Sequence, residues 1–404
     1  METMIIKDTD GISRAADVIL SGGLCAVPTE TVYGLAANGL DSEAVARIYE
    51  VKGRPSVKPI SLMVSGSNAI NDLCEKVPVV VQTLTDRFWP GPLTLVLRAK
   101  TLVPEILRAG GETVGLRCPR QPQTLALLER LDYPLAVPSA NPSGEPSPHN
   151  AQQVMDYFGG KIEAVIDGGE SELGLESTVV DFSRTPYRIL RQGSLPAEEL
   201  MDALVDAMTV VGITGGSGCG KTTALYELEK RGALILDCDA IYHELLEKDL
   251  SLIEELGTAF PGTVKEGKLR RGVLAEIVFR DAVKLKQLNE ITHRRIEAEI
   301  TSRLRDWAMQ GGTLAALDAI ELISSGLAER CDFTMAVIAS EDTRIQRIME
   351  RDGISRESAK LRIKAQRPNE YFEQNCDVTL CNNGSFEQFV HQLNDIWEER
   401  LNHG

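Results

Sequence analysis

The feature that most constrains the fold is a glycine-rich loop in the middle of the chain, GITGGSGCGKTT from Gly212 to Thr223. Its Gly-x4-Gly-Lys-Thr pattern follows a short apolar stretch, which predicts a strand, and precedes TTALYELEKRG, which predicts a helix. In that order the backbone N–H groups of the loop and the positive end of the helix can bind phosphate. The pattern therefore predicts a nucleotide-binding domain with a parallel sheet from about residue 209, and a plain glycine turn is the alternative.

Each residue type in this loop has its own expected task. The glycines let the backbone curl around phosphate oxygens, Lys221 is expected to contact the β- and γ-phosphates, and Thr222 is expected to hold Mg²⁺ through its hydroxyl. The predicted ATP-binding residues of the loop are Gly215, Gly218, Gly220, Lys221, Thr222 and Thr223.

Two carboxylates follow at the end of the next predicted strand, ALILDCD. Asp237 and Asp239 would lie at the carboxyl edge of the sheet, where open α/β folds bind their substrates. A carboxylate there can accept a proton from an attacking hydroxyl or orient Mg²⁺, and it can equally be a helix cap.

Charged segments at 244–310 and 341–367 are predicted as long helices. The second carries a series of arginines, whose guanidinium groups stabilise charge on a transferring phosphoryl group unless they only form a solvated helix face. These residues are Arg344, Arg347, Arg351, Arg362 and Arg367.

Together with EGKLRRGVLAEIVF, LNEITHRRI and RIQRIMERDGISRESAKLRIKAQ, these motifs resemble the dephospho-coenzyme A kinases over about residues 209–400. The resemblance implies transfer of the γ-phosphate of ATP to the ribose 3′-hydroxyl of dephospho-CoA. It makes Asp239 the catalytic base beside Lys221, and it places Arg347 and Arg351 in a helical lid over ATP. Weaker candidates for substrate contact are Arg270, Arg271 and His293.

The chain departs from that family at two positions. Arg294 follows His293 where the family usually has proline, and Ser324 stands where a glutamate is usual. Both departures concern contacts to the substrate, and neither touches the glycine loop or Asp239.

A complete domain is expected ahead of the loop, because 404 residues exceed what one hydrophobic core normally organises. We predict a first domain at 1–196, a helical junction at 197–208 and the kinase-like domain at 209–404. No Gly/Ser-rich or Pro-rich tether separates them.

The first half predicts a mixed α/β domain. Helices are expected at 12–21 and at 42–52, the second with Ser42 as its cap. Strands are expected in LCAVPT, ISLMV, LTLVL, TVGLRCP, PLAVPSAN, EAVIDGG, STVVDF and YRILRQG.

Polar motifs recur at the ends of these strands: PTETVYGL, KGRPSVKPISL, WPGPLTLVL, TVGLRCP, PSANPSG, ESTVVD and ILRQG. Several combine a cation with Ser or Thr, as a site for phosphate and carboxylate groups requires. Any one of them alone could be turn chemistry.

In this order the motifs resemble the YrdC family of threonylcarbamoyl-AMP synthases over about residues 5–195. The resemblance implies a twisted open α/β sheet with a concave cavity. It also implies formation of threonylcarbamoyl-AMP and pyrophosphate from L-threonine, bicarbonate and ATP, for modification of adenosine 37 in tRNA. Partners would then include tRNA or tRNA-modification proteins.

The resemblance assigns roles motif by motif. Thr31, Arg117 and Ser177 would contact threonine. ATP phosphates would be held by Lys52, Arg54 and Lys58. The nucleotide side would be lined by Thr113, Ser139, Asn141 and Arg191. Aligning the reactants and neutralising the leaving pyrophosphate with cations and Mg²⁺ is the main demand of such a reaction.

The remaining sequence features narrow the class of protein. A net charge of −16 argues against DNA binding, and eight scattered cysteines without metal-ligand spacing indicate a reducing compartment. We expect Cys219 to be a buried, inert thiol. No signal peptide or membrane span is expected, and the predicted location is the cytoplasm. The alternative function is a kinase fused to a non-catalytic RNA- or nucleotide-binding module.

Overall fold

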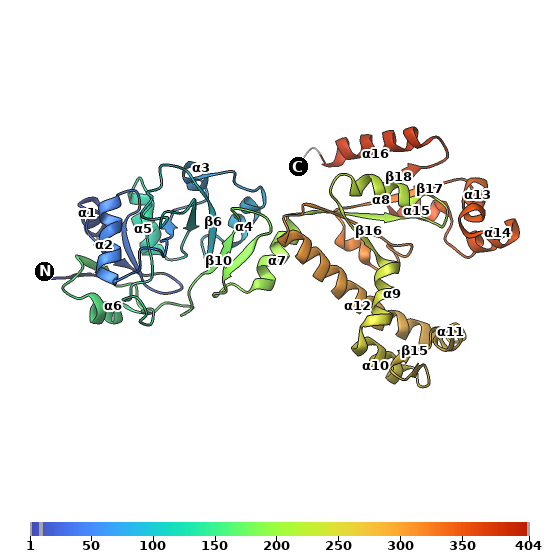
Figure 1. Cartoon of the computed structure of the whole chain (residues 1–404), viewed down its shortest axis with the longest axis horizontal. Helices are drawn as coiled ribbons and strands as arrows, with labels where there is room; N and C mark the ends of the chain where they lie inside the picture. The colour runs from blue at the N-terminus through green and yellow to red at the C-terminus, as the bar shows by residue number, and fades with distance from the viewer. Residues whose placement is uncertain (1, 8–10, 402–404) are drawn as a thin grey trace. The chain divides into compact units, whose positions relative to one another are not determined.

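The computed structural model describes residues 2–7 and 11–401, whose contacts divide the chain into two compact units (Figure 1). The first unit ends at Ala207 and takes in Met309–Gly311, and the second holds the rest from Met208 on. The helix at Ala197–Asp206 belongs to the first unit.

Within the described residues of the first unit, eleven strands form one mixed sheet, in the order β1-β9-β2-β3-β8-β4-β7-β6-β10-β11, with β5 paired to β6. The sheet contains both parallel and antiparallel pairs, such as β10 with β6 and β6 with β7. The strands are β1 Met4–Ile6, β2 Cys25–Val27, β3 Gly34–Asn38, β4 Leu62–Met63, β5 Cys74–Glu75, β6 Leu93–Ala99, β7 Thr113–Arg117, β8 Leu135–Ala136, β9 Ala164–Ile166, β10 Thr178–Asp181 and β11 Arg188–Arg191. The predicted strands and the mixed α/β class are confirmed.

Helices pack on this sheet through apolar stripes. Helix α1, for example, buries Ile12, Ala15, Ala16 and Ile19. The helices are α1 Gly11–Leu20, α2 Ser42–Lys52, α3 Ala69–Leu73, α4 Val80–Phe88, α5 Pro122–Arg130, α6 Ala151–Phe158 and α7 Ala197–Asp206. The predicted cap of α2 was wrong: the side chain of Asp41, not Ser42, accepts hydrogen bonds from the N–H groups of Glu43 and Ala44.

The second unit is built on a fully parallel five-stranded sheet in the order β13-β16-β12-β17-β18. Its strands are β12 Thr209–Thr214, β13 Leu234–Asp237, β16 Leu314–Asp318, β17 Phe333–Ile338 and β18 Val378–Cys381. The helices are α8 Lys221–Glu229, α9 Cys238–Lys248, α10 Leu250–Ala259, α11 Arg271–Val278, α12 Ala282–Met309, α13 Glu341–Asp352, α14 Arg356–Lys364, α15 Asn369–Asn375 and α16 Phe386–Leu401, with a 3-10 turn at Leu327–Arg330. The predicted parallel sheet is confirmed.

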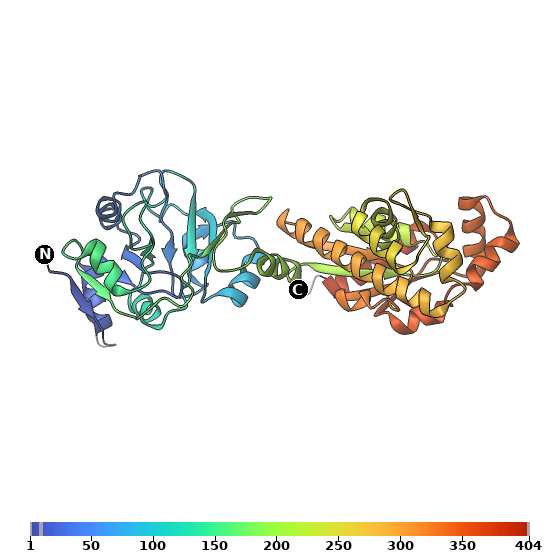
Figure 2. The same cartoon turned by 90° about the horizontal axis from the view of Figure 1, so that it is seen from below.

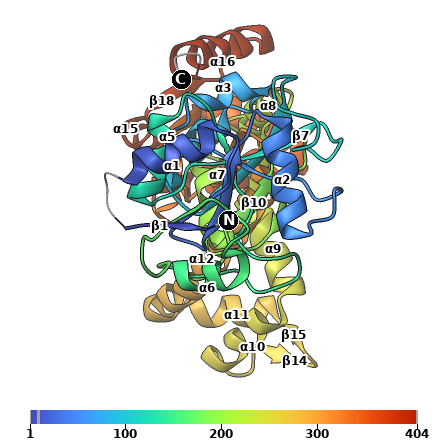
Figure 3. The same ribbon diagram turned by 90° about the vertical axis from the view of Figure 1, so that its left-hand side faces the viewer.

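Helices α9 to α12 fill most of 244–310, as predicted, but one part of this range is not helical. A small hairpin, β14 Val264–Lys265 with β15 Lys268–Leu269, packs with α9 and α10 (Figure 3). Its turn residues Glu266 and Gly267 have φ of 54° and 71°, which helical backbone does not allow. The long helix α12, drawn in orange in Figure 2, follows this segment.

Two further facts concern the whole described chain. The eight cysteines all lie in the described ranges and are free thiols. Among the described helices, none combines the length and the apolar character that crossing a membrane requires.

Candidate functional sites

The sheet of the first unit carries a cavity of about 350 Å³. Its walls come from β3, β4, β6, β7, β10 and β11, from the segments before β3, β4 and β10, and from the segment after β8. Most of the residues predicted for the first domain line it: Thr31, Arg54, Thr113, Arg117, Ser139, Ser177 and Arg191.

Arg117 is held in this wall by a buried ion pair that the sequence did not suggest. Its Nη2 donates to Glu30 Oε1 at 2.8 Å and to Thr31 Oγ1 at 2.9 Å, and its Nε donates to the carbonyl oxygen of Gly91 at 3.2 Å. The side chains of Arg117 and Glu30 are only 7% and 1% exposed. Glu30 lies inside the quoted motif PTET, between the two threonines, and it fixes the orientation of the guanidinium group.

A second cluster joins Arg191, Ser177 and two residues that the sequence analysis missed. Arg191 forms an ion pair with Glu176, and its Nη2 donates to Ser177 Oγ at 3.1 Å. Ser177 Oγ also lies 2.8 Å from Thr94 Oγ1. The Arg191 charge is therefore already balanced, and the cluster presents hydroxyl groups to the cavity.

Lys52 and Arg54 are cations without a carboxylate partner among the described residues. Lys52 is 3% exposed, and its Nζ donates to the carbonyl oxygens of Ser139 and Asn141. Burial, and then the nearby positive charge of Arg54, lower the pKa of Lys52 to about 7. Arg54 donates to the carbonyl oxygens of Lys58 and Pro59 at 3.1 and 2.9 Å. Lys52 and Arg54 therefore lack a direct ion pair, and the charge of Glu176 acts on both at longer range.

Three of the predicted residues do not form the cavity wall. Lys52 contacts it only through the backbone of Ser139. The side chain of Lys58 is exposed, and Asn141 is buried with its Nδ2 bonded to the carbonyl oxygen of Pro142. Asn141 Oδ1 has no hydrogen-bond partner.

The glycine loop of the second unit packs tightly against its neighbours. A Cβ added to Gly215, whose φ is +142°, would lie 2.2 Å from the carbonyl oxygen of Val337 on β17. A Cβ on Gly220, with φ +99°, would lie 2.0 Å from Asn382 Nδ2. Gly218, with φ +80°, is equally confined to glycine. Glycine is thus required by the backbone and by the packing of the loop.

Lys221 begins α8, and its side chain joins the loop to a carboxylate at the edge of the sheet. Its Nζ donates to the carbonyl oxygen of Gly215 at 3.1 Å and lies 3.8 Å from Asp318 Oδ1. Asp318 ends β16 opposite Asp237 of β13. Burial raises the pKa of Asp318 to about 6, with a contribution from the charges of Asp237 and Asp239, while Lys221 lowers it.

Asp318 is not among the site residues predicted from the sequence. The signal that could have identified it is an acidic residue directly after an apolar core strand, as at Asp237. The Oδ1 atom of Asp318 has no hydrogen-bond partner.

Two hydroxyl-bearing residues lie in the first turn of α8: Thr222, which is exposed, and Thr223, which follows it. No group of three or more His, Cys, Asp or Glu residues in the described ranges is arranged to hold a metal by itself.

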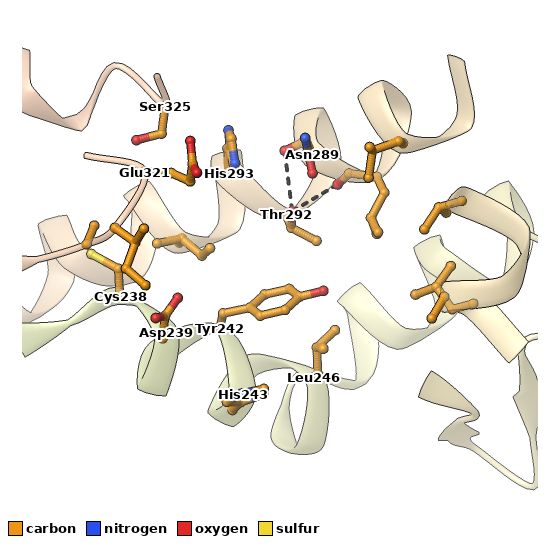
Figure 4. Close-up of a pocket in the computed structure, with 18 of the residues that line it drawn as sticks. Cys238, Asp239, Tyr242, His243, Leu246, Asn289, Thr292, His293, Glu321 and Ser325 are labelled. Atoms are coloured by element: carbon orange, nitrogen blue, oxygen red, sulfur yellow. Dashed lines mark hydrogen bonds between the residues drawn. The ribbon is translucent and has the colours of Figure 1, made fainter. Parts of the chain in front are cut away.

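The two strand-end carboxylates have different positions. Asp237 caps α9, because its side chain accepts the N–H of Ala240 at 2.9 Å. Asp239 lies in the first turn of α9 and lines a cavity of about 420 Å³. Figure 4 shows Asp239 on one side of this cavity, with Glu321, His293 and Ser325 on the other. Apolar side chains of α9, α11 and α12 line its remaining walls.

Arg271 and His293 line this cavity, whereas Arg270 does not. Arg294 lies in the middle of the unbroken helix α12 and forms an ion pair with Glu255 of α10. The exposed Ser324 donates through Oγ to the carboxylate of Glu321. Glu321, which the sequence analysis missed, thus supplies a carboxylate in the loop where the family-typical glutamate is absent.

The arginines of α13 divide into two groups. Arg347 donates to the carbonyl oxygen of Cys219 in the loop at 3.3 Å and to Asn382 Oδ1 at 3.2 Å. Arg351 instead pairs with Asp352 at 2.7 Å and does not contact the loop. Arg362 also pairs with Asp352, and Arg367 lies over the ring of Tyr371.

Within the glycine loop, Cys219 is fully buried. Its burial raises the pKa of the thiol, as an inert thiol requires.

Comparisons with known proteins divide at the same place as the two units. Residues 17–193 match a family model described as "Telomere recombination", for Sua5, YciO and YrdC. Residues 209–388 match the family model described as "Dephospho-CoA kinase".

Individual relatives follow the same division. A threonylcarbamoyl-AMP synthase of Pyrococcus abyssi is 48% identical over 47% of this chain and 56% of its own length. A Mycobacterium tuberculosis protein named "Putative threonylcarbamoyl-AMP synthase" is 38% identical over 50% of this chain and 93% of its own length. A dephospho-CoA kinase of Thermobifida fusca is 34% identical over 48% of this chain and 96% of its own length. The chain spans about half the length of the first curated relatives that it matches.

Proposed function

Because the chain belongs to the Sua5/YciO/YrdC family over its first half and to the dephospho-CoA kinase family over its second half, we propose that it is a bifunctional enzyme. The first domain forms threonylcarbamoyl-AMP and pyrophosphate from L-threonine, bicarbonate and ATP. The second transfers the γ-phosphate of ATP to the 3′-hydroxyl of dephospho-CoA. The proposed extents are 1–196 and 209–404, joined by 197–208.

The observation that supports the first activity is the distribution of charge in the cavity of the first unit. Arg117 and Arg191 form ion pairs with Glu30 and Glu176, whereas Lys52 and Arg54 form no ion pair with any described carboxylate and interact with the charge of Glu176 only at longer range. A triphosphate with its high negative charge would therefore bind on the Lys52–Arg54 side. The oriented Arg117 Nη groups with Thr31 and Ser177 suit the threonine carboxylate and hydroxyl.

The remaining predicted residues keep secondary roles in this proposal. Thr113, Ser139 and Arg191 line the nucleotide side, and Asn141 supports Lys52 through its carbonyl oxygen. Lys58 reaches phosphate only by a rotation of its exposed side chain. The product would serve tRNA modification, with tRNA or a tRNA-modification protein as the receiving partner.

The observation that supports the second activity is the placement of Asp239 in a cavity whose wall residue Ile320 accepts a hydrogen bond from Thr214, within the glycine-rich stretch, at 3.1 Å. Gly215, Gly218, Gly220, Lys221, Thr222 and Thr223 would bind the phosphates of ATP, and Arg347 would brace the loop. Asp239 would accept the proton of the substrate hydroxyl as the phosphoryl group moves. We assign Glu321 to hydrogen bonding with the substrate, opposite Asp239. Arg351 would approach ATP only after leaving Asp352.

Mg²⁺ is part of the proposal for both reactions. In the second unit the Thr222 hydroxyl and Asp318 Oδ1, which accepts no hydrogen bond, are oxygen ligands of the kind that Mg²⁺ prefers. The ion would neutralise phosphate charge there.

The free cysteines and the net negative charge of the chain suit the cytoplasm, where we place the protein.

One purified preparation of the full chain tests both activities. Pyrophosphate release should require threonine and bicarbonate together, and ADP formation should require dephospho-CoA. The alternative, a kinase with a non-catalytic nucleotide- or RNA-binding module, predicts retained nucleotide or RNA with no pyrophosphate. If dephospho-CoA leaves ATP intact, the kinase assignment is wrong.

A further inference from the structure

Arg344, on α13, is a buried cation beneath the glycine loop. The residue is 3% exposed, and it forms no ion pair with any described carboxylate. Its Nε donates to the carbonyl oxygen of Ser217 at 3.0 Å, and its Nη2 donates to Gln366 Oε1 at 3.0 Å. All of its described hydrogen-bond partners are therefore neutral.

Gln366, which follows α14, completes a closed cluster with Arg344 and Ser217. Its Oε1 also accepts the N–H of Ser217 at 2.9 Å, and its Nε2 donates to Ser217 Oγ at 2.8 Å. The N–H, the carbonyl and the hydroxyl of this loop residue are thus all bonded to the two side chains.

The guanidinium group also packs directly on the loop backbone. A Cβ added to Gly216 would lie 2.2 Å from Arg344 Nη2. This contact explains the second glycine of the pair Gly215-Gly216, which the phosphate-binding pattern itself does not require. It places the positive charge of Arg344 immediately behind the backbone that is proposed to curl around ATP.

A buried charge is costly unless an opposite charge compensates it. Among the described residues no carboxylate does so for Arg344, and the proposed phosphates of ATP are the anions that would arrive next to it. Interactions across the low-dielectric loop backbone are screened far less than surface charges.

We propose that Arg344, fixed by Gln366, is a positioning residue that draws the phosphates of ATP into the glycine loop from behind and links the segment after α14 to the loop. The proposal rests on ATP binding at this loop. It gives Arg344 a role apart from that of Arg347, which contacts the carbonyl oxygens of Gly218 and Cys219 and the side chain of Asn382.

The isosteric variant Gln366→Glu separates this role from a purely structural one. Its carboxylate can still accept from Arg344 and from the Ser217 N–H, and the Ser217 hydroxyl can turn to donate to it. The packing is preserved, but the charge of Arg344 is neutralised in advance. We expect unchanged or increased thermal stability together with a dissociation constant for a non-hydrolysable ATP analogue raised about tenfold or more.

Binding is measured by calorimetry on the full chain carrying Arg54→Ala, so that the second unit reports alone and no reaction with dephospho-CoA is needed. Gln346→Glu, an exposed position on α13, is the matched control and should change affinity less than twofold. In the ADP-forming assay Gln366→Glu should raise KM for ATP and leave KM for dephospho-CoA unchanged.

Unchanged affinity in Gln366→Glu would overturn the proposal. So would an affinity that falls only together with the melting temperature, because that result indicates a structural role. If the parent chain binds the analogue but dephospho-CoA yields no ADP, the kinase assignment fails while the binding comparison still decides the role of Arg344.

Discussion

Lys52 gives the first unit a group that titrates near neutral pH. Its pKa of about 7 lies below the ordinary value of 10.5, so between these pH values the unfolded chain binds more protons than the folded one. Stability of this unit should therefore rise with pH across that window. An ATP phosphate nearby would raise the pKa again, so ATP binding at pH 8 should take up part of a proton.

Calorimetry in buffers of different ionisation enthalpy measures this uptake. The measurement uses the full chain carrying Lys221→Ala, which weakens ATP binding by the second unit. In this background, Lys52→Met should abolish the proton uptake. Lys161→Met, an exposed control, should retain it. Equal binding enthalpies in all buffers for the parent chain would contradict the assigned position of the triphosphate.

Glu321 should matter for dephospho-CoA and not for ATP. Removing the charge in Glu321→Gln weakens a charge-assisted hydrogen bond, which contributes about 1.5–3 kcal/mol. We expect KM for dephospho-CoA to rise about tenfold with KM for ATP unchanged. Glu329→Gln, an exposed change on the nearby 3-10 turn, is the control. An unchanged KM for dephospho-CoA in Glu321→Gln would remove Glu321 from the substrate site.

At the scale of elements, the glycine loop depends on its contact with β17. Gly215→Ala would push a Cβ onto the carbonyl oxygen of Val337 at a φ of +142°, and strain of this kind costs about 1–3 kcal/mol. The variant should lose ATP binding by the second unit and lower its melting temperature. Gly272→Ala on α11 meets open space and should change stability by no more than about 1 kcal/mol. Equal behaviour of the two variants would refute this packing argument.

Motifs at strand ends carried most of what the sequence could predict. Arg117 and Arg191 end β7 and β11, and Ser177 directly precedes β10 of the same sheet. They meet in one cavity with Thr31, which lies between β2 and β3, and with Arg54, which lies just after α2. The site residues that the sequence did not predict depend on strand register and on side chains far apart in the sequence. Asp318 faces Asp237 only through the pairing of β16 with β13, and Gln366 reaches Ser217 across 149 positions of sequence.

Predictions from neighbouring sequence alone failed where a second residue nearby could form the same cap or ion pair. Asp41 caps α2 in place of the neighbouring Ser42, since a residue one position earlier can direct its carboxylate to the first free N–H groups. Arg351 lies on the predicted lid helix, but the adjacent Asp352 binds it, with Arg362 on the other side. Short-range ion pairs of this kind do not follow from a family motif.

At the scale of the whole molecule, each unit has its own hydrophobic core. One core gathers α1, α5 and strands such as β2 and β9, and another gathers α8, α16 and the parallel sheet. The two proposed ATP sites also use different means: unpaired cations in a sheet cavity, and backbone N–H groups with a lysine in a glycine loop. The account's central claim is that the two chemistries are separable.

Reciprocal variants of the full chain test this claim most directly, with pyrophosphate and ADP measured in one preparation. Arg54→Ala should reduce pyrophosphate release at least a hundredfold and leave ADP formation within twofold of the parent chain. Lys221→Ala should give the reverse result. Loss of both products in either folded variant, or loss of neither in both, would contradict the account.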